Sequence, residues 1–128
     1  MAAALPAGAA VSQQSPSVAV VQIGSPAVLD ARGAAVNVPL SFVCSPGANA
    51  FVFVFLNERV GNDIASGGSD ELSLGGCTGS SQSASVTVLA NGNAFRQGVA
   101  VGSAQLVVFN DVGELVGTDQ RNVEVAKK

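Results

Sequence analysis

The sequence contains no histidine, no tryptophan and no tyrosine. Without histidine, its two cysteines cannot be completed into a Cys/His zinc site, and the usual pairs of a nucleophile with a histidine base are unavailable. Without tryptophan or tyrosine, the protein has only its six phenylalanines to stack against a sugar ring. These absences predict a protein that is not an enzyme and that carries no cofactor.

Charge is also scarce. Charged residues make up 12% of the chain, about half of the usual share of about 25%, and the net charge is -3. The six basic residues are scattered, apart from the adjacent Lys127 and Lys128. No basic stripe is available for phosphate backbones, so nucleic acid is not expected as a partner. No apolar run reaches the roughly 18 to 20 residues of a membrane-spanning helix, so no transmembrane segment is expected.

A few carboxylates lie close together in the sequence. Asp111 and Glu114 flank one turn, and Asp63, Asp70 and Glu71 fall in a segment rich in glycine and serine. Such groups could serve as a glycosidase acid and base, or as oxygen ligands for calcium. Acidic residues in turns more often bond their own backbone or face solvent, and the spacing does not fit an EF-hand. We therefore expect no catalytic and no metal-binding residues.

The first residues differ in composition from the rest of the chain. Residues 2–12 are small and apolar, and the stretch 1–16 carries no charge and ends at Ser15-Pro16. Ala7-Gly8-Ala9 fits the small-residue pattern that precedes a signal-peptidase site. Residues 1–16 are therefore expected to be a signal-peptide remnant or a disordered leader, and 17–128 the folded domain.

The two cysteines, Cys44 and Cys77, enclose 77 − 44 − 1 = 32 residues. This spacing is not a CxxC redox motif, and each cysteine stands beside turn residues. The sequence predicts a disulfide between them rather than two buried free thiols. A disulfide is typical of secreted and cell-surface proteins.

Residues 17–128 consist of short apolar runs with a period of two, separated by glycine, proline, asparagine and serine. This pattern predicts an all-β fold, most simply an Ig-like Greek-key sandwich of about seven strands. Residues 61–76 are expected to be a loop that contains one short strand. The expected strands are 18–23, 27–30, 35–44, 51–58, 71–74, 83–90, 99–110 and 114–126.

Several segments resemble a known group of proteins. They are 38–44, 74–79, 84–88, 95–98 and 118–123. Together they are similar to small secreted actinobacterial proteins that have a single Ig-like domain and one cysteine pair. The resemblance implies export, the disulfide and the fold, and it supplies no catalytic residues.

Two strands are apolar on both faces, which a sandwich strand does not require. In 51–56, three phenylalanines alternate with two valines and a leucine, and 106–109 repeats the feature. In an Ig-like topology these two strands are neighbours, so their outer faces merge into one apolar patch. The interface candidates are Phe51, Val52, Phe53, Val54, Phe55, Leu56, Leu106, Val107, Val108 and Phe109. The pattern does not tell which face is buried.

Three functions fit this patch. The first is a secreted or cell-surface module that associates with itself or with another protein through the sheet face. The second is an extracellular filament subunit, in which 18–23 completes the sheet of a neighbour. The third is a small-molecule carrier, since antitumour chromoproteins of the neocarzinostatin type are similar small acidic sandwiches, although they have two cysteine pairs. Alternatively, the leader, 18–23 or 61–76 covers the patch internally.

Overall fold

The computed structural model describes residues 17–128, and the expected leader, 1–16, lies outside the described residues. The described residues form strands and one short 3-10 turn, η1 (Ala31–Gly33), without an α-helix. None of them belongs to a helix long and apolar enough to cross a bilayer. The strands are β2 (Ala19–Ile23), β3 (Ala27–Asp30), β4 (Ala35–Cys44), β5 (Asn49–Val60), β6 (Asp63–Gly68), β7 (Leu72–Gly76), β8 (Gln82–Ala90), β9 (Gly98–Asn110) and β10 (Gly113–Ala126).

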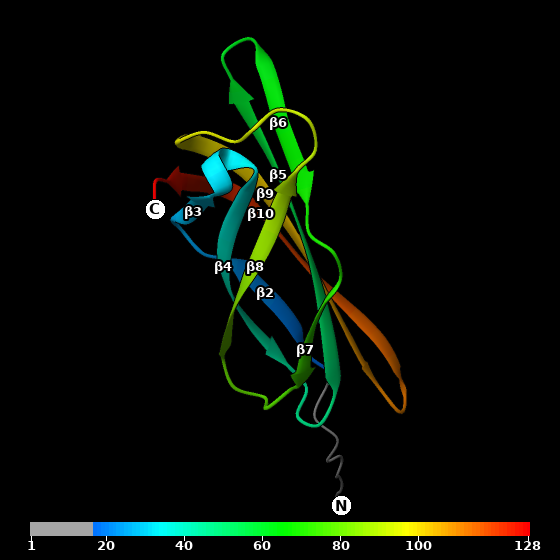
Figure 1. Cartoon of the computed structure of the whole chain (residues 1–128). Coiled ribbons are helices and arrows are strands. Elements are labelled where there is room, and N and C mark those ends of the chain that lie inside the picture. The colour runs from blue at the N-terminus through cyan, green and yellow to red at the C-terminus, as the bar shows by residue number, and fades with distance from the viewer. Residues whose placement is uncertain (1–16) are drawn as a thin grey trace, which may run out of the picture.

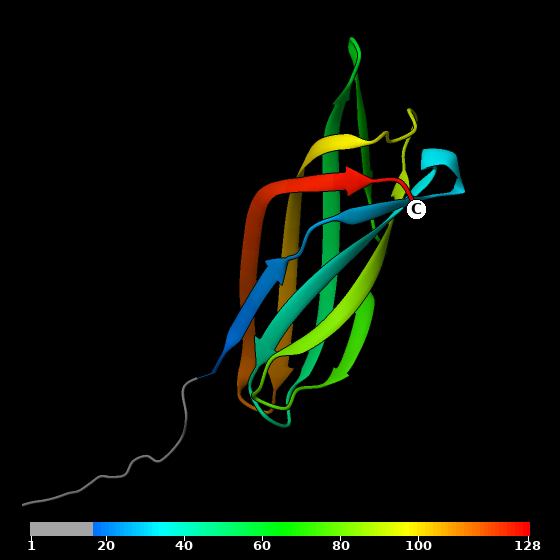
Figure 2. The same cartoon turned by 90° about the vertical axis from the view of Figure 1, so that its left-hand side faces the viewer.

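The strands form an Ig-like Greek-key sandwich of two layers. One layer is β2–β4–β8, and the other is β3–β10–β9–β5, with β6 and β7 both paired to the far edge of β5. In Figure 2 the strands of the first layer slant across those of the second. β3 pairs with both β4 and β10, the latter in parallel, so it joins the two layers at one side. The nearly all-strand content, together with one disulfide, confirms the predicted fold class.

Alternation along β4 builds one wall of the core. Every second residue of β4 is buried, namely Val36, Val38, Leu40, Phe42 and Cys44. The residues between them are only partly buried. Val86 and Val88 on β8 continue the same buried surface. β-branched side chains in this pattern suit a strand with one buried face.

Cys44 and Cys77 form the predicted disulfide. Cys44 ends β4, and Cys77 lies between β7 and β8. The backbone around the bridge is also hydrogen-bonded: the N–H of Cys77 donates to the carbonyl of Ala48 at 2.8 Å, and the N–H of Gly47 donates to the carbonyl of Cys77 at 2.9 Å. The bridge ties the end of β4, and the hydrogen bonds tie the turn after it, to the connection that leads into β8. Figure 1 shows the end of β4 and this connection at the same end of the molecule.

The segment 61–76 differs from its expected loop. It contains β6 as well as β7, because β5 extends to Val60 and pairs with β6 as a hairpin. The glycines and serines of this segment favoured a loop over a strand at β6, and one of the glycines is required for packing. A Cβ at Gly67 would clash with the carbonyl oxygen of Leu89, where β6 meets β8. Glycine therefore allows β6 to close the sandwich on this side.

Candidate functional site

The structure settles which face of residues 51–56 is buried. Val52, Val54 and Leu56 lie in the core with no exposed surface, so the three phenylalanines point to the outside of the sheet. Phe55 is 48% exposed, and Phe51 and Phe53 are partly exposed. The aromatic side of β5 is thus its outer side.

β9 follows the same pattern. Leu106 and Val108 are buried, and Val107 and Phe109 are on the outer side, partly exposed. The rings of Phe51 and Phe109 lie 5.1 Å apart between centroids, at an interplanar angle of 50°. Of the ten interface candidates, the five buried ones belong to the core, and the five outer ones remain available to a partner.

The strand register brings a sixth apolar residue to this surface. Phe51 on β5 pairs with Val107 on β9, which in turn pairs with Val116 on β10. Val116 is 43% exposed, and the sequence analysis missed it. Counting back from the turn between Asn110 and Gly113 pairs Val107 with Val116, so the hairpin was the signal that could have found it. We call Phe51, Phe53, Phe55, Val107, Phe109 and Val116 the outer apolar face.

The outer apolar face is almost free of charge. Its neighbours on the same side of the sheet are hydroxyl and amide side chains, apart from Glu114, which pairs with Phe109. These neighbours are Asn49, Ser103, Gln105, Thr118 and Gln120. A hollow of about 390 Å³ lies beside Phe55, against Ser103, Gln105, Thr118 and Asp119, whose carboxylate is paired with Arg121. Such a surface can bury apolar area and form hydrogen bonds.

Two of the segments expected to cover this face lie elsewhere. β6 and β7 pair with the edge of β5 and extend the sheet beside the phenylalanines. β2 pairs with β4 in the opposite layer. The leader, which was the third candidate cover, lies outside the described residues.

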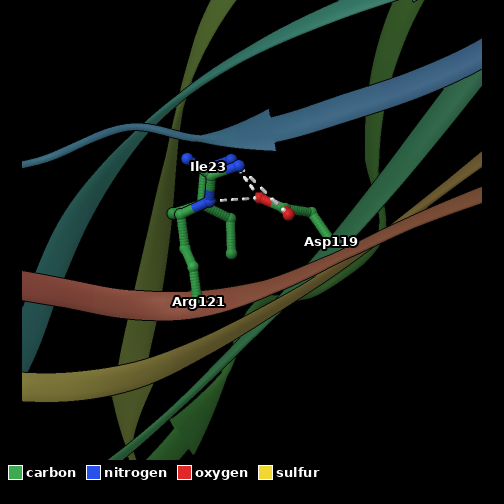
Figure 3. Close-up of polar contacts among 3 residues, drawn as sticks. All are labelled: Ile23, Asp119 and Arg121. Carbon is green, nitrogen blue, oxygen red and sulfur yellow. Dashed lines mark hydrogen bonds and ion pairs between the residues drawn. The ribbon is translucent and has the colours of Figure 1, made fainter.

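β2 is held on its two edges by different means. One edge forms a ladder with β4 from Ala19 to Ile23. On the other side, the N–H of Ile23 donates to the Asp119 carboxylate of β10 at 2.8 Å, and Arg121 pairs with the same carboxylate oxygen at 2.8 Å (Figure 3). Gly117 permits this approach, since a Cβ there would clash with the carbonyl oxygen of Ala19. A strand that donates itself to a neighbour would have to leave both partners.

The Asp119 carboxylate gives this contact a pH dependence. Burial alone raises the pKa of Asp119, but the hydrogen bonds from Arg121 and Ile23, together with the charge of Arg121, hold it below its ordinary value. The contribution to stability is therefore complete above about pH 4 and is lost as the pH falls through the pKa of the folded state.

We expect Asp119→Asn to lower the free energy of unfolding by about 1 kcal/mol at neutral pH, and by less near pH 3. Urea unfolding at the two pH values measures the difference. Arg121→Gln is the matched variant. It keeps the carboxylate of Asp119 but removes the guanidinium whose hydrogen bond and charge lower the pKa of Asp119. If the difference in the free energy of unfolding between wild type and Asp119→Asn did not change with pH, the Asp119 carboxylate would not be the source of the pH dependence.

No known family model matches the chain, and no curated protein matches it in sequence. Solved structures do match in shape. AggA, the major subunit of aggregative adherence fimbriae type I from Escherichia coli, is 11% identical with a TM-score of 0.43, over 89% of this chain and 97% of AggA. The sporulation control protein Spo0M from Bacillus subtilis is 10% identical with a TM-score of 0.39, over 84% of this chain and 50% of Spo0M. At these scores neither likeness indicates what this chain does.

Proposed function

We propose that this protein is a non-catalytic Ig-like module, secreted or at the cell surface, that acts by protein–protein association through the outer apolar face. The observation that carries the proposal is the outward orientation of three phenylalanines on β5 beside Val107 and Val116. The centre of a protein interface is typically rich in aromatic residues and poor in charge. The outer apolar face has both properties.

A second copy of the chain is the partner that fits this face best. Two sheets pack face to face about 10 Å apart, with side chains that interdigitate. Because Glu114 is the one charged residue among the outward-facing positions in register with residues 49–55 of β5, two copies would meet without strong like-charge repulsion. Each copy would also bury its outer apolar face against that of the other copy.

The disulfide supports the proposed location. A bond between Cys44 and Cys77 persists in an oxidising environment, such as the outside of the cell. The low charge content fits the same setting, because the surface is built from small polar groups rather than from lysine and glutamate.

Phe53→Lys tests the association. Phe53 lies on β5 between the other two outward phenylalanines, so association would place an unpaired ammonium from each copy inside the interface. We expect the dissociation constant to rise roughly a hundredfold or more, which corresponds to several kcal/mol. Light scattering after size exclusion, on non-reduced full-length protein over a range of concentrations, measures the change.

Ser85→Lys is the matched control. Ser85 is exposed on β8, in the other layer, so the same charge is added away from the outer apolar face. The control is expected to associate like the wild type. A wild type that stays monomeric up to about 100 µM, or a Phe53→Lys variant that associates unchanged, would refute self-association through this face.

An extracellular filament subunit is the second candidate, and the observation that favours it is that β2 has a strand partner, β4, on one edge alone. Its other edge meets β10 through the Asp119 side chain and close packing at Gly117, not through a strand pairing. Removal of residues 1–24 should then abolish assembly and leave a soluble protein. A small-molecule carrier, the third candidate, predicts a monomer whose melting temperature rises with an apolar ligand.

A further inference from the structure

Four of the six basic residues of this acidic protein meet at one hollow, away from the outer apolar face. Arg32, Arg96, Lys127 and Lys128 line a space of about 500 Å³, and Asp30 is the one acidic side chain among the lining residues. Within 17–128 the one ion pair joins Arg121 and Asp119, so none of these four cations is neutralised by a carboxylate. A chain with a net charge of -3 thus has a concentrated positive site.

Three segments distant in sequence build the hollow. Arg32 is in η1, Arg96 is in the connection between β8 and β9, and the lysines follow the end of β10. η1 and the end of the chain lie side by side in both views (Figures 1 and 2). The parallel pairing of β3 with β10 is what brings them together, since Ala126 is in register with Val28.

The turn that carries Arg32 has an unusual backbone. Ala31, Arg32 and Gly33 all have positive φ angles, of 50°, 57° and 87°. Residues other than glycine rarely adopt this conformation, and such strain is concentrated at functional sites. The strained turn is held in place from the neighbouring segment, because the N–H of Phe95 donates to the carbonyl of Gly33 at 2.9 Å and a Cβ at Gly33 would clash with the carbonyl oxygen of Phe95.

A buried carboxylate fixes the second arginine. Glu58 on β5 is 3% exposed, and its Oε1 accepts from the backbone N–H of Arg96 at 2.8 Å. Its Oε2 is buried without a hydrogen-bond partner. The backbones of Arg32 and Arg96 are therefore both anchored, while the two side chains remain exposed to solvent. Anchoring of this kind lowers the ordering cost of binding a ligand.

We propose that this hollow binds a phosphomonoester group. Guanidinium groups present paired donors to phosphate oxygens, and ammonium groups add charge without a fixed geometry. Four cations against Asp30 suit an anion with more than one negative charge better than a single carboxylate. Leu29 beside them offers apolar contact to the organic part of the ligand. The remaining basic residues, Arg59 and Arg121, do not line the hollow, so no stripe continues along a nucleic acid.

Calorimetric titration of full-length protein with phenyl phosphate, a phosphomonoester with an apolar group, at low ionic strength tests the site. We expect saturable binding to the wild type and a dissociation constant at least about tenfold higher for Arg32→Gln/Arg96→Gln. Arg59→Gln is the matched control, because Arg59 is exposed on β5 outside the hollow, and its binding should stay within about twofold of the wild type. Since the substituted arginines are exposed, melting curves should show that all variants fold alike.

Vesicles distinguish a lipid from a soluble ligand. Sedimentation with vesicles that contain phosphatidic acid, displaced by phenyl phosphate, would indicate a lipid headgroup. Phenyl phosphate binding without sedimentation would indicate a soluble phosphomonoester. The absence of saturable phenyl phosphate binding, or an equal loss of affinity in Arg59→Gln, would overturn the proposal, because the attraction would then be absent or diffuse.

Discussion

Replacement of Cys44 and Cys77 by alanine is expected to lower the free energy of unfolding by about 3 to 4 kcal/mol. The bridge joins residues 33 positions apart, and without it the unfolded chain regains the freedom of that loop. The variant also loses two sulfur atoms from buried positions, which adds to the effect. Denaturant unfolding of the non-reduced wild type and of the double variant measures the difference.

Two controls separate the bridge from the loss of side-chain packing. The wild type unfolded with a reductant should lose most of the same stability while it retains both sulfur atoms. Cys44→Ala alone should resemble the double variant, because one cysteine cannot form the bond. An unchanged unfolding midpoint in the double variant would show that the bridge does not restrict the unfolded chain.

The disulfide also relates stability to location. The connection that contains Cys77 joins β7, in one layer, to β8, in the other. The bridge and two backbone hydrogen bonds attach this connection to the turn after β4. A reducing compartment would remove the covalent part of that attachment, so the protein is expected to be most stable where thiols are oxidised.

The sequence predicted strands well wherever one face was apolar. β4 begins and ends at the predicted residues, because five buried side chains alternate with less buried ones between a glycine-containing turn and Cys44-Ser45-Pro46. β6 was missed because its sequence has no apolar alternation; it forms a strand because it follows β5 directly and pairs with it as a hairpin. It has one buried residue, Ala65, and Gly67 allows its close contact with β8.

The outer apolar face could be predicted in part. The alternation showed that 51–56 has two apolar sides, and the topology placed the strand next to 106–109. The buried side could not be chosen, since phenylalanine and valine are both common in cores. The choice follows from packing in the core, where the valines and leucine of β5 join one buried cluster with side chains of β4 and β8.

The basic hollow could not be predicted at all. Arg32, Arg96 and Lys127 are more than thirty positions apart from one another in the sequence, and each one stands among uncharged neighbours or at the chain end. They meet because β3 pairs with β10 and because the backbone near Phe95 bonds to Gly33. Only the assembled fold places them together.

Leu56→Ala and Phe55→Ala should differ sharply, although the two residues are adjacent on β5. Leu56 is fully buried between the layers, so its truncation leaves a cavity and should lower the free energy of unfolding by about 2 to 5 kcal/mol. Phe55 loses more atoms, but it is 48% exposed on the outer apolar face, and its truncation should lower the same quantity by less than about 1 kcal/mol. Denaturant unfolding of dilute, monomeric protein compares the two.

Association should be weakened more by Phe55→Ala than by Leu56→Ala. Phe55→Ala removes apolar area from the surface that meets the partner, so it should weaken association, whereas Leu56→Ala leaves that surface intact as long as the variant is folded. If Phe55→Ala instead destabilised the monomer as much as Leu56→Ala and left association unchanged, the phenylalanines would have a structural role and the outer apolar face would not be an interface. Stability and association measured on the same two variants therefore test separately what holds this sandwich together and what it binds.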